Sequence, residues 1–200
     1  MHISNLLERT NTTPDQDDQL LVIDGVSWQQ YLAIDTALES VPGLRLTYCQ
    51  GLLEIMTLSS RHEQVKTMIG RLLETYALVK NIDLYGYGST TQRNEEKQGG
   101  LEPDESYCVG DLTAIPNLAI EVTITSGGIN KLQIYKNLGI KEVWFWQNQQ
   151  VSIYVLQDDA YQLVNQSQLL PDLDLAMLSR YIQPERQPQA VREFYHFLLQ

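Results

Sequence analysis

The chain has 200 residues, of which 43% are hydrophobic, and this is enough apolar content for one domain with one sizeable core. Its 14 Lys and Arg against 25 Asp and Glu give a formal net charge of −11, which excludes a non-specific DNA-coating protein, because affinity for the phosphate backbone depends on cationic side chains. The sequence has no membrane-spanning apolar run and no signal-peptide pattern at its start, so we expect a cytoplasmic protein with no membrane partner.

Composition divides the chain into three segments. Residues 1–18 are polar and acidic and predict a loose tail. Residues 19–165 carry alternating strand and helix patterns and are expected to form the main domain. Residues 166–200 contain two short apolar segments around a Pro-rich linker, which predict a helical extension packed on the same domain.

The first half of the main domain predicts a strand, a helix, a hairpin and a long helix. Ser27 and Gln30 have capping-box spacing, so the first helix is expected to begin there. The pair 50–51, Gln-Gly, separates two apolar segments and predicts a tight hairpin turn. Ser60 and Glu63 form a second capping box, after which apolar residues recur at helical spacing over about five turns.

The second half predicts a mixed sheet. Residues 91–100 are expected to form a polar loop, followed by two short strands, the first beginning at Asp104 and the second containing Glu121. A helix over 129–138 and a strand over 142–147 come next. Because a strand–helix–strand connection forms a right-handed crossover, the last strand should lie parallel to the Glu121 strand, and an antiparallel meander should follow.

Asp104 and Glu121 are candidate metal ligands. A hairpin would bring both carboxylates to one edge of a sheet, where Mg²⁺ or Mn²⁺ prefers such oxygen ligands. Taken singly, an Asp after Pro103 can simply start a turn, and Glu121 can form a buried ion pair with a lysine. The two carboxylates together, with Lys131 at the start of the following helix, favour a metal-dependent phosphodiesterase site.

Three stretches carry a resemblance to a known family: "GLLEIM", "GGLEPDESY" and "PNLAIEVT…INKLQIYKNLGIKEVWFW". They resemble the Uma-two family of restriction endonucleases, which is bacterial, abundant in cyanobacteria and part of the PD-(D/E)XK superfamily. The resemblance covers roughly residues 20–165. It implies an α/β, restriction-endonuclease-like core with a central mixed β-sheet flanked by helices. It also implies a metal-dependent endonuclease that hydrolyses phosphodiester bonds in DNA.

The resemblance also assigns the catalytic lysine. The superfamily usually places this lysine two residues after the glutamate, where this chain has Thr123. In the resembled family the lysine lies in the following helix within a Lys-Leu-x-x-Tyr pattern, which Lys131 matches. Asp104, Glu121 and Lys131 are therefore the expected catalytic residues, with Lys136 as a weaker substitute for the lysine.

Three further residues are secondary candidates. Glu54 is expected either to contact the metal site or to be an exposed strand carboxylate. His62 is expected either to cap and pack its helix or to contact a phosphate or orient a carboxylate. Arg93 is a candidate for phosphate binding, although a solvated loop charge is the simpler interpretation.

The resemblance leaves an alternative open, in which the fold has lost turnover and acts as a dimeric binding or regulatory protein. A small-molecule hydrolase is less favoured, because no Gly-x-Ser-x-Gly turn is present. We also expect a homodimer or higher homo-oligomer, since the aromatic run 144–146, the apolar meander after it and the C-terminal apolar segment offer more apolar surface than one sheet face readily buries. Cys49 and Cys108 lack metal-binding spacing and are expected to be buried free thiols.

Overall fold

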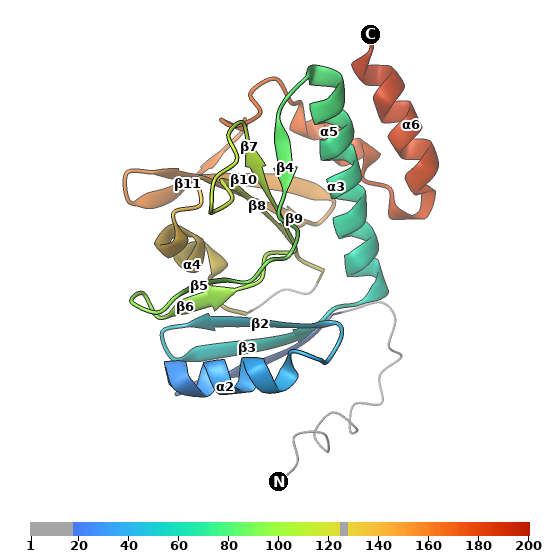
Figure 1. Cartoon of the computed structure of the whole chain (residues 1–200). Helices are drawn as coiled ribbons and strands as arrows, with labels where there is room; N and C mark the ends of the chain where they lie inside the picture. Colours follow the sequence, from blue (N-terminus) through green and yellow to red (C-terminus); the bar gives the residue numbers. More distant parts are fainter. Residues whose placement is uncertain (1–17, 125–127) are drawn as a thin grey trace.

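The computed structural model describes residues 18–124 and 128–200. Its strands form two sheets, with the long helix α3 along one side (Figure 1). The sequence predicted one central mixed sheet, and the second sheet is an addition to that prediction. Of the predicted tail, only Asp18 lies within the described part of the chain, and it is buried.

The first sheet is built from antiparallel strands and is covered on one face by helix α2, Trp28–Leu38 (Figure 1). The hairpin between the second and third strands turns at residues 50–51, as predicted. In spatial order the strands are β1 (Gln19–Ile23), β3 (Leu52–Thr57), β2 (Leu44–Cys49), β6 (Gly99–Leu101) and β5 (Gln92–Asn94).

The second sheet is mixed. Strands β8 and β9 are parallel and are joined through helix α4, Lys131–Leu138, so the predicted crossover is confirmed. The other pairings that the structure shows in this sheet are antiparallel. In spatial order the strands are β11 (Ala160–Val164), β10 (Gln150–Gln157), β9 (Glu142–Gln147), β8 (Leu118–Val122), β7 (Glu105–Val109) and β4 (Leu84–Gly86).

Helix α3, Ser60–Lys80, packs its apolar stripe against the second sheet, and this contact forms the main hydrophobic core. The C-terminal segment packs on the same core through α5 (Leu175–Tyr181) and α6 (Gln187–Leu198), which are joined by the 3₁₀ turn η1 (Pro184–Arg186). Helix α6 lies along the outer side of α3 (Figure 1). In the described part of the chain, no helix is long and apolar enough to cross a membrane.

The N-terminal caps of the helices show how well local sequence patterns predict the residue at which a helix begins. The capping box of Ser27 and Gln30 is confirmed, because each side chain accepts a hydrogen bond from the other residue's backbone N–H. The long helix is capped by Ser59, whose hydroxyl accepts from the N–H of His62, and not by Ser60 as predicted.

The predicted loop over residues 91–100 is wrong, because it contains β5 and the start of β6. Strand β6 fits beside β2 because Gly100 has no side chain there: a Cβ on Gly100 would lie 2.6 Å from the Tyr31 hydroxyl oxygen. A Gly-Gly pair has low strand propensity, so the local sequence carries no signal for this pairing.

The aromatic run does not supply the exposed surface expected for dimer formation. Trp144 and Trp146 are buried in the main core, and Phe145 is half-buried. Exposed apolar side chains remain on the meander, at Leu163 of β11, and in the C-terminal segment, at Tyr195, Phe197 and Leu199, so the homodimer prediction now depends on these two surfaces. Both cysteines are free thiols, with Cys108 buried and Cys49 half-buried.

Candidate active site

Asp104 and Glu121 meet where β7 begins and β8 ends. Glu105 lies opposite Ile120 in the antiparallel register, so Asp104, one residue earlier, lies opposite Glu121, one residue later. Both side chains are only 1% exposed. The sequence therefore predicted correctly that a hairpin brings these two carboxylates together.

Asp104 is held as an ion pair with His62. Its Oδ2 accepts a hydrogen bond from the Val122 N–H at 2.7 Å and lies 3.2 Å from His62 Nε2. Burial opposes the charge of both groups, but the His62 contact and the Lys131 charge lower the pKa of Asp104. The Asp104 carboxylate in turn raises the pKa of His62, although burial works against it.

His62 has a second contact in the same site. Its Nε2 lies 3.0 Å from the carbonyl oxygen of Val122, so one ring nitrogen touches both this carbonyl and Asp104. The side chain is fully buried, and its Nδ1 has no hydrogen-bond partner among the described residues. His62 is therefore packed in the interior, as one interpretation predicted, and it also contacts a carboxylate, as the other predicted.

Glu121 is held by two side chains from helix α4. Lys131 Nζ donates to Oε2 at 2.7 Å, and the hydroxyl of Tyr135 donates to Oε1. These two residues are four positions apart, so they lie on the same face of the helix. This geometry gives a physical reason for the Lys-Leu-x-x-Tyr spacing, in which the tyrosine had no role assigned from the sequence.

The site concentrates negative charge around one ammonium. Burial raises the pKa of Glu121, the Asp104 carboxylate raises it further, and Lys131 opposes the rise. Burial disfavours the charged form of Lys131, but the carboxylates of Glu121, Asp104 and Glu54 raise its pKa above the ordinary value. Lys131 is therefore a cation, and the carboxylates around it retain an excess of negative charge.

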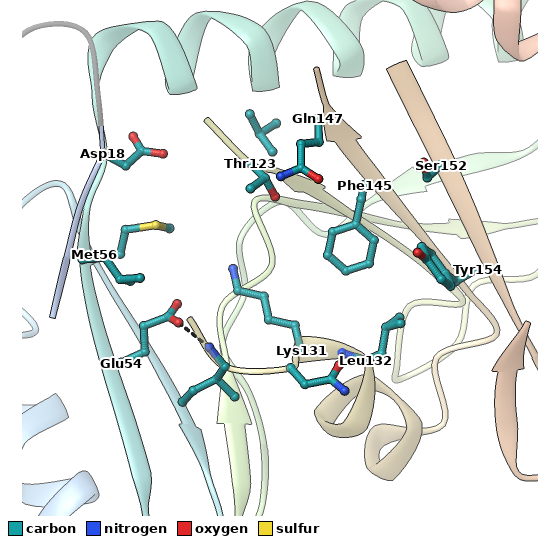
Figure 2. A pocket seen from close by; sticks show the side chains of 14 residues that line it. Asp18, Glu54, Met56, Thr123, Lys131, Leu132, Phe145, Gln147, Ser152 and Tyr154 are labelled. Atoms are coloured by element: carbon teal, nitrogen blue, oxygen red, sulfur yellow. Dashed lines mark hydrogen bonds between the residues drawn. The ribbon is translucent and has the colours of Figure 1, made fainter. Parts of the chain in front are cut away.

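A cavity of about 270 Å³ adjoins this cluster. Figure 2 shows the Lys131 side chain extending into it from α4, with Asp18 and Glu54 on the wall formed by the first sheet. Phe145 and Tyr154, from the second sheet, lie on the other side (Figure 2). The cavity therefore lies between the two sheets and has Lys131 at its centre.

Glu54 and Asp18 are both buried carboxylates of this cavity. Glu54 is 3% exposed and its Oε2 accepts from the Ile129 N–H at 2.8 Å, so the interpretation as an exposed strand residue is wrong. Asp18 Oδ1 accepts from the Ser59 N–H at 2.8 Å. The sequence assigned Asp18 to the tail and missed it, because an acidic residue in a polar stretch carries no signal of burial.

Gly128 allows this wall to close against the start of α4. Its φ is +103°, and a Cβ added there would overlap the Glu54 carboxylate. Both the backbone conformation and the lack of space therefore require glycine at this position.

Two predicted cations lie elsewhere. The guanidinium of Arg93 forms an ion pair with Asp35 and a hydrogen bond with the Tyr31 hydroxyl, on the side of the first sheet that carries α2. Lys136 Nζ pairs with the exposed Asp159 at 2.7 Å. Neither lines the cavity, so Lys131 is the lysine that the fold brings to the two carboxylates.

The oxygen donors fit a hard divalent cation. Within residues 18–124 and 128–200, no three His, Cys, Asp or Glu side chains group as a metal-ligand set. Mg²⁺, however, commonly takes one or two carboxylates and completes its shell with other oxygens. Asp104, Glu121 and the Val122 carbonyl supply such atoms, and a cation bound there would compete with the N–H donors of His62 and Lys131.

A third buried carboxylate of the same sheet has a different environment. Glu142, on β9, accepts from the Trp144 indole N–H at 2.5 Å and from the backbone N–H groups of Gln168 and Leu169. The structure places no charged partner beside it in the part of the chain that it describes, whereas Asp104 contacts His62 and Glu121 contacts Lys131. Burial of an acid alone therefore does not define the site; the charged partners of the two carboxylates do.

Comparison with known proteins identifies the family of the chain. The family model Uma2, described as "Putative restriction endonuclease", matches residues 28–187, well over half of the chain. A search of curated proteins found no match. The architecture of a mixed sheet with flanking helices agrees with a restriction-endonuclease-like fold, so the predicted fold class is confirmed. The chain therefore belongs to the Uma2 family.

Proposed function

We propose that this protein is a metal-dependent endonuclease that hydrolyses phosphodiester bonds in DNA, with Mg²⁺ or Mn²⁺ as its cofactor. The observation that carries the proposal is the meeting of Asp104, Glu121 and Lys131 beside one cavity. Asp104 and Glu121 do not line the cavity themselves, but their carboxylates can supply cation ligands next to it, and the Lys131 ammonium inside it can contact a phosphate.

Each residue has a role that its contacts support. Asp104, Glu121 and the Val122 carbonyl would hold the cation, which when bound supplies an acidified water and polarises the phosphate. His62 orients Asp104 through the 3.2 Å contact. Tyr135 orients Glu121 through its hydroxyl hydrogen bond.

Lys131 acts as a positive charge and not as a base in this proposal. Its ammonium is paired with Glu121 at 2.7 Å and extends into the cavity (Figure 2). A lysine on a flexible stem can leave the carboxylate and stabilise the negative charge that develops on the phosphate.

The opposite wall explains why a cation is needed. Asp18 and Glu54 line the same cavity, so a phosphate entering it meets two carboxylates on the wall formed by the first sheet. Lys131 is the only Lys or Arg among the lining residues that the structure describes. A divalent cation would offset the repulsion that one lysine cannot offset alone.

The test is cleavage of plasmid and of single-stranded DNA with Mg²⁺ or Mn²⁺, using Asp104→Asn, Glu121→Gln and Lys131→Met. Each substitution is expected to reduce cleavage at least about 100-fold, the usual cost of losing a transition-state charge contact. The matched controls are Glu142→Gln, an equally buried acid on the next strand, and Lys136→Met, on the same helix. Both controls should keep cleaving.

The alternative of a non-enzymatic binding or regulatory protein has its own signature. The hydrogen bonds that His62, Lys131 and Tyr135 donate already satisfy the two carboxylates, as a purely structural network would. If Mn²⁺ fails to raise the melting temperature of the wild type, and no variant changes cleavage, the network is structural. A Mn²⁺ stabilisation that disappears in Asp104→Asn supports the enzyme.

A further inference from the structure

A second and larger hollow adjoins the cavity. It has a volume of about 1000 Å³ and lies between the first turn of α3, the β9–β10 hairpin, the end of β11 and the segment α5–η1. Thr123 and Ser152 line both spaces, so the hollow lies next to the cavity that Lys131 enters. Thr123 is also only two residues beyond Glu121.

The charge of the hollow is opposite to that of the whole chain. Its lining contains two arginines, Arg61 and Arg180, and one acid, Glu185, among the residues that the structure describes. Both guanidinium groups are exposed, and no carboxylate of the described residues forms an ion pair with either. In a protein with a net charge of −11, a hollow with two unpaired arginines is a local site for an anionic ligand.

Arg61 in particular gains nothing from its helix. It lies in the first turn of α3, where the helix macrodipole already places positive charge. A cation there is unfavourable for the helix, and it adds to the positive potential at the mouth of the hollow. Ligand binding gives this residue a role that helix stability does not.

The other lining residues fit nucleotide bases. The rim carries the side-chain amides of Asn148, Gln149 and Asn165, which can donate to and accept from base edges and sugars. The floor contains Val65, Ile124 and other apolar residues that belong to the edge of the main core. An apolar floor suits the faces of unstacked bases better than the charged exterior of a duplex.

The β9–β10 turn presents its amide at a conformational cost. Asn148 and Gln149 have φ of +51° and +62°, and they form the two-residue loop that pairs Gln147 with Gln150. Such turns favour glycine at the second loop position, and a long side chain in left-handed backbone is disfavoured. For the turn alone, glycine would therefore be a better choice than Gln149.

We propose that this hollow binds a single-stranded nucleic-acid segment next to the phosphate that is cleaved. The proposal rests on the endonuclease function and adds the strand form of the substrate and the path that it follows. Arg61 and Arg180 contact backbone phosphates, the rim amides contact base edges, and the apolar floor contacts base faces.

The test is equilibrium binding of a fluorescein-labelled single strand of about 12 nucleotides, a length within the usual range for single-strand sites. Binding is measured by fluorescence anisotropy in a buffer that contains EDTA. Without metal the probe is not cut, so binding is measured separately from catalysis. For a single strand, the logarithm of the binding constant falls by about 0.7 per phosphate contact for each tenfold rise in salt concentration. Between 1 M and 0.1 M salt, one arginine contact therefore raises the affinity about fivefold, and two contacts raise it about 25-fold. The double variant Arg61→Gln with Arg180→Gln should show this loss and a slope reduced by about 1.4.

Two further variants separate binding from folding. Arg192→Gln removes one exposed charge on α6 outside the hollow and should leave the salt slope unchanged. Gln149→Gly should raise the melting temperature and weaken binding at the same time. A folding defect would lower the melting temperature and weaken binding together, so it cannot produce a higher melting temperature with weaker binding.

The outcomes are distinct. An unchanged affinity and slope in the arginine double variant overturns the proposal, and so does equal binding of heparin, a polyanion without bases. Tighter binding of a matched duplex than of the single strand overturns the strand assignment. If cleavage is insensitive to Asp104→Asn while the arginine variants lose binding, the endonuclease proposal fails and the nucleic-acid site stands.

Discussion

Replacing Lys131 with methionine tests the charge balance of the buried cluster. Methionine keeps the volume of the lysine stem and removes the ammonium that donates to Glu121 Oε2 at 2.7 Å. Removing one partner of a buried ion pair costs about 3–5 kcal/mol. The Lys131 side chain is 15% exposed and Tyr135 still donates to Glu121, so we expect the lower end, about 3 kcal/mol at pH 8.

The pH dependence of this loss follows from Glu121. Burial raises the pKa of Glu121 above its ordinary value of 4.5, and removing the opposing ammonium raises it further. The folded carboxyl then holds a proton that the unfolded chain has lost, so the stability of the variant falls as pH rises. The slope is about 1.4 kcal/mol per pH unit above a pH of about 4.5, until the folded pKa is passed. In the wild type the same fall ends at a lower pH.

The assay is urea unfolding between pH 5 and pH 8, monitored by the fluorescence of the buried tryptophans. A second variant, Lys131→Met with Glu121→Gln, carries no buried charge at this position and should recover most of the loss at pH 8. Equal destabilisation of the single and double variants would refute the reasoning, as would a loss in the single variant that does not change with pH.

Three further substitutions test the scaffold. Glu142→Ala leaves the Trp144 indole and two backbone N–H groups buried without acceptors, so urea unfolding should show a loss of at least about 3 kcal/mol. Gly128→Ala forces a side chain into the Glu54 carboxylate, and calorimetry should show a lower melting temperature together with weaker Mn²⁺ stabilisation. Ser27→Ala removes the cap of α2 and should cost about 1 kcal/mol without affecting cleavage.

The sequence predicted those parts of the site that local patterns and the family resemblance define. Asp104 was found because it directly precedes a short apolar strand, Glu121 because it lies near the end of the next one, and Lys131 because it matches a motif at the start of a helix. The first sheet was missed in part, since β6 depends on packing of Gly100 against Tyr31, which is a tertiary contact. Asp18 was missed for the same reason: its burial depends on the sheet that it joins and not on its neighbours in the sequence.

The first turn of α3 joins the two parts of the proposed binding surface. His62 touches Asp104 and the Val122 carbonyl, while Arg61, the preceding residue, lines the larger hollow. A cation bound at Asp104 would compete with His62, which shares the first turn of α3 with Arg61. Thermodynamic linkage then requires reciprocity: the factor by which a cation changes the affinity for a nucleic-acid strand equals the factor by which the strand changes the affinity for the cation.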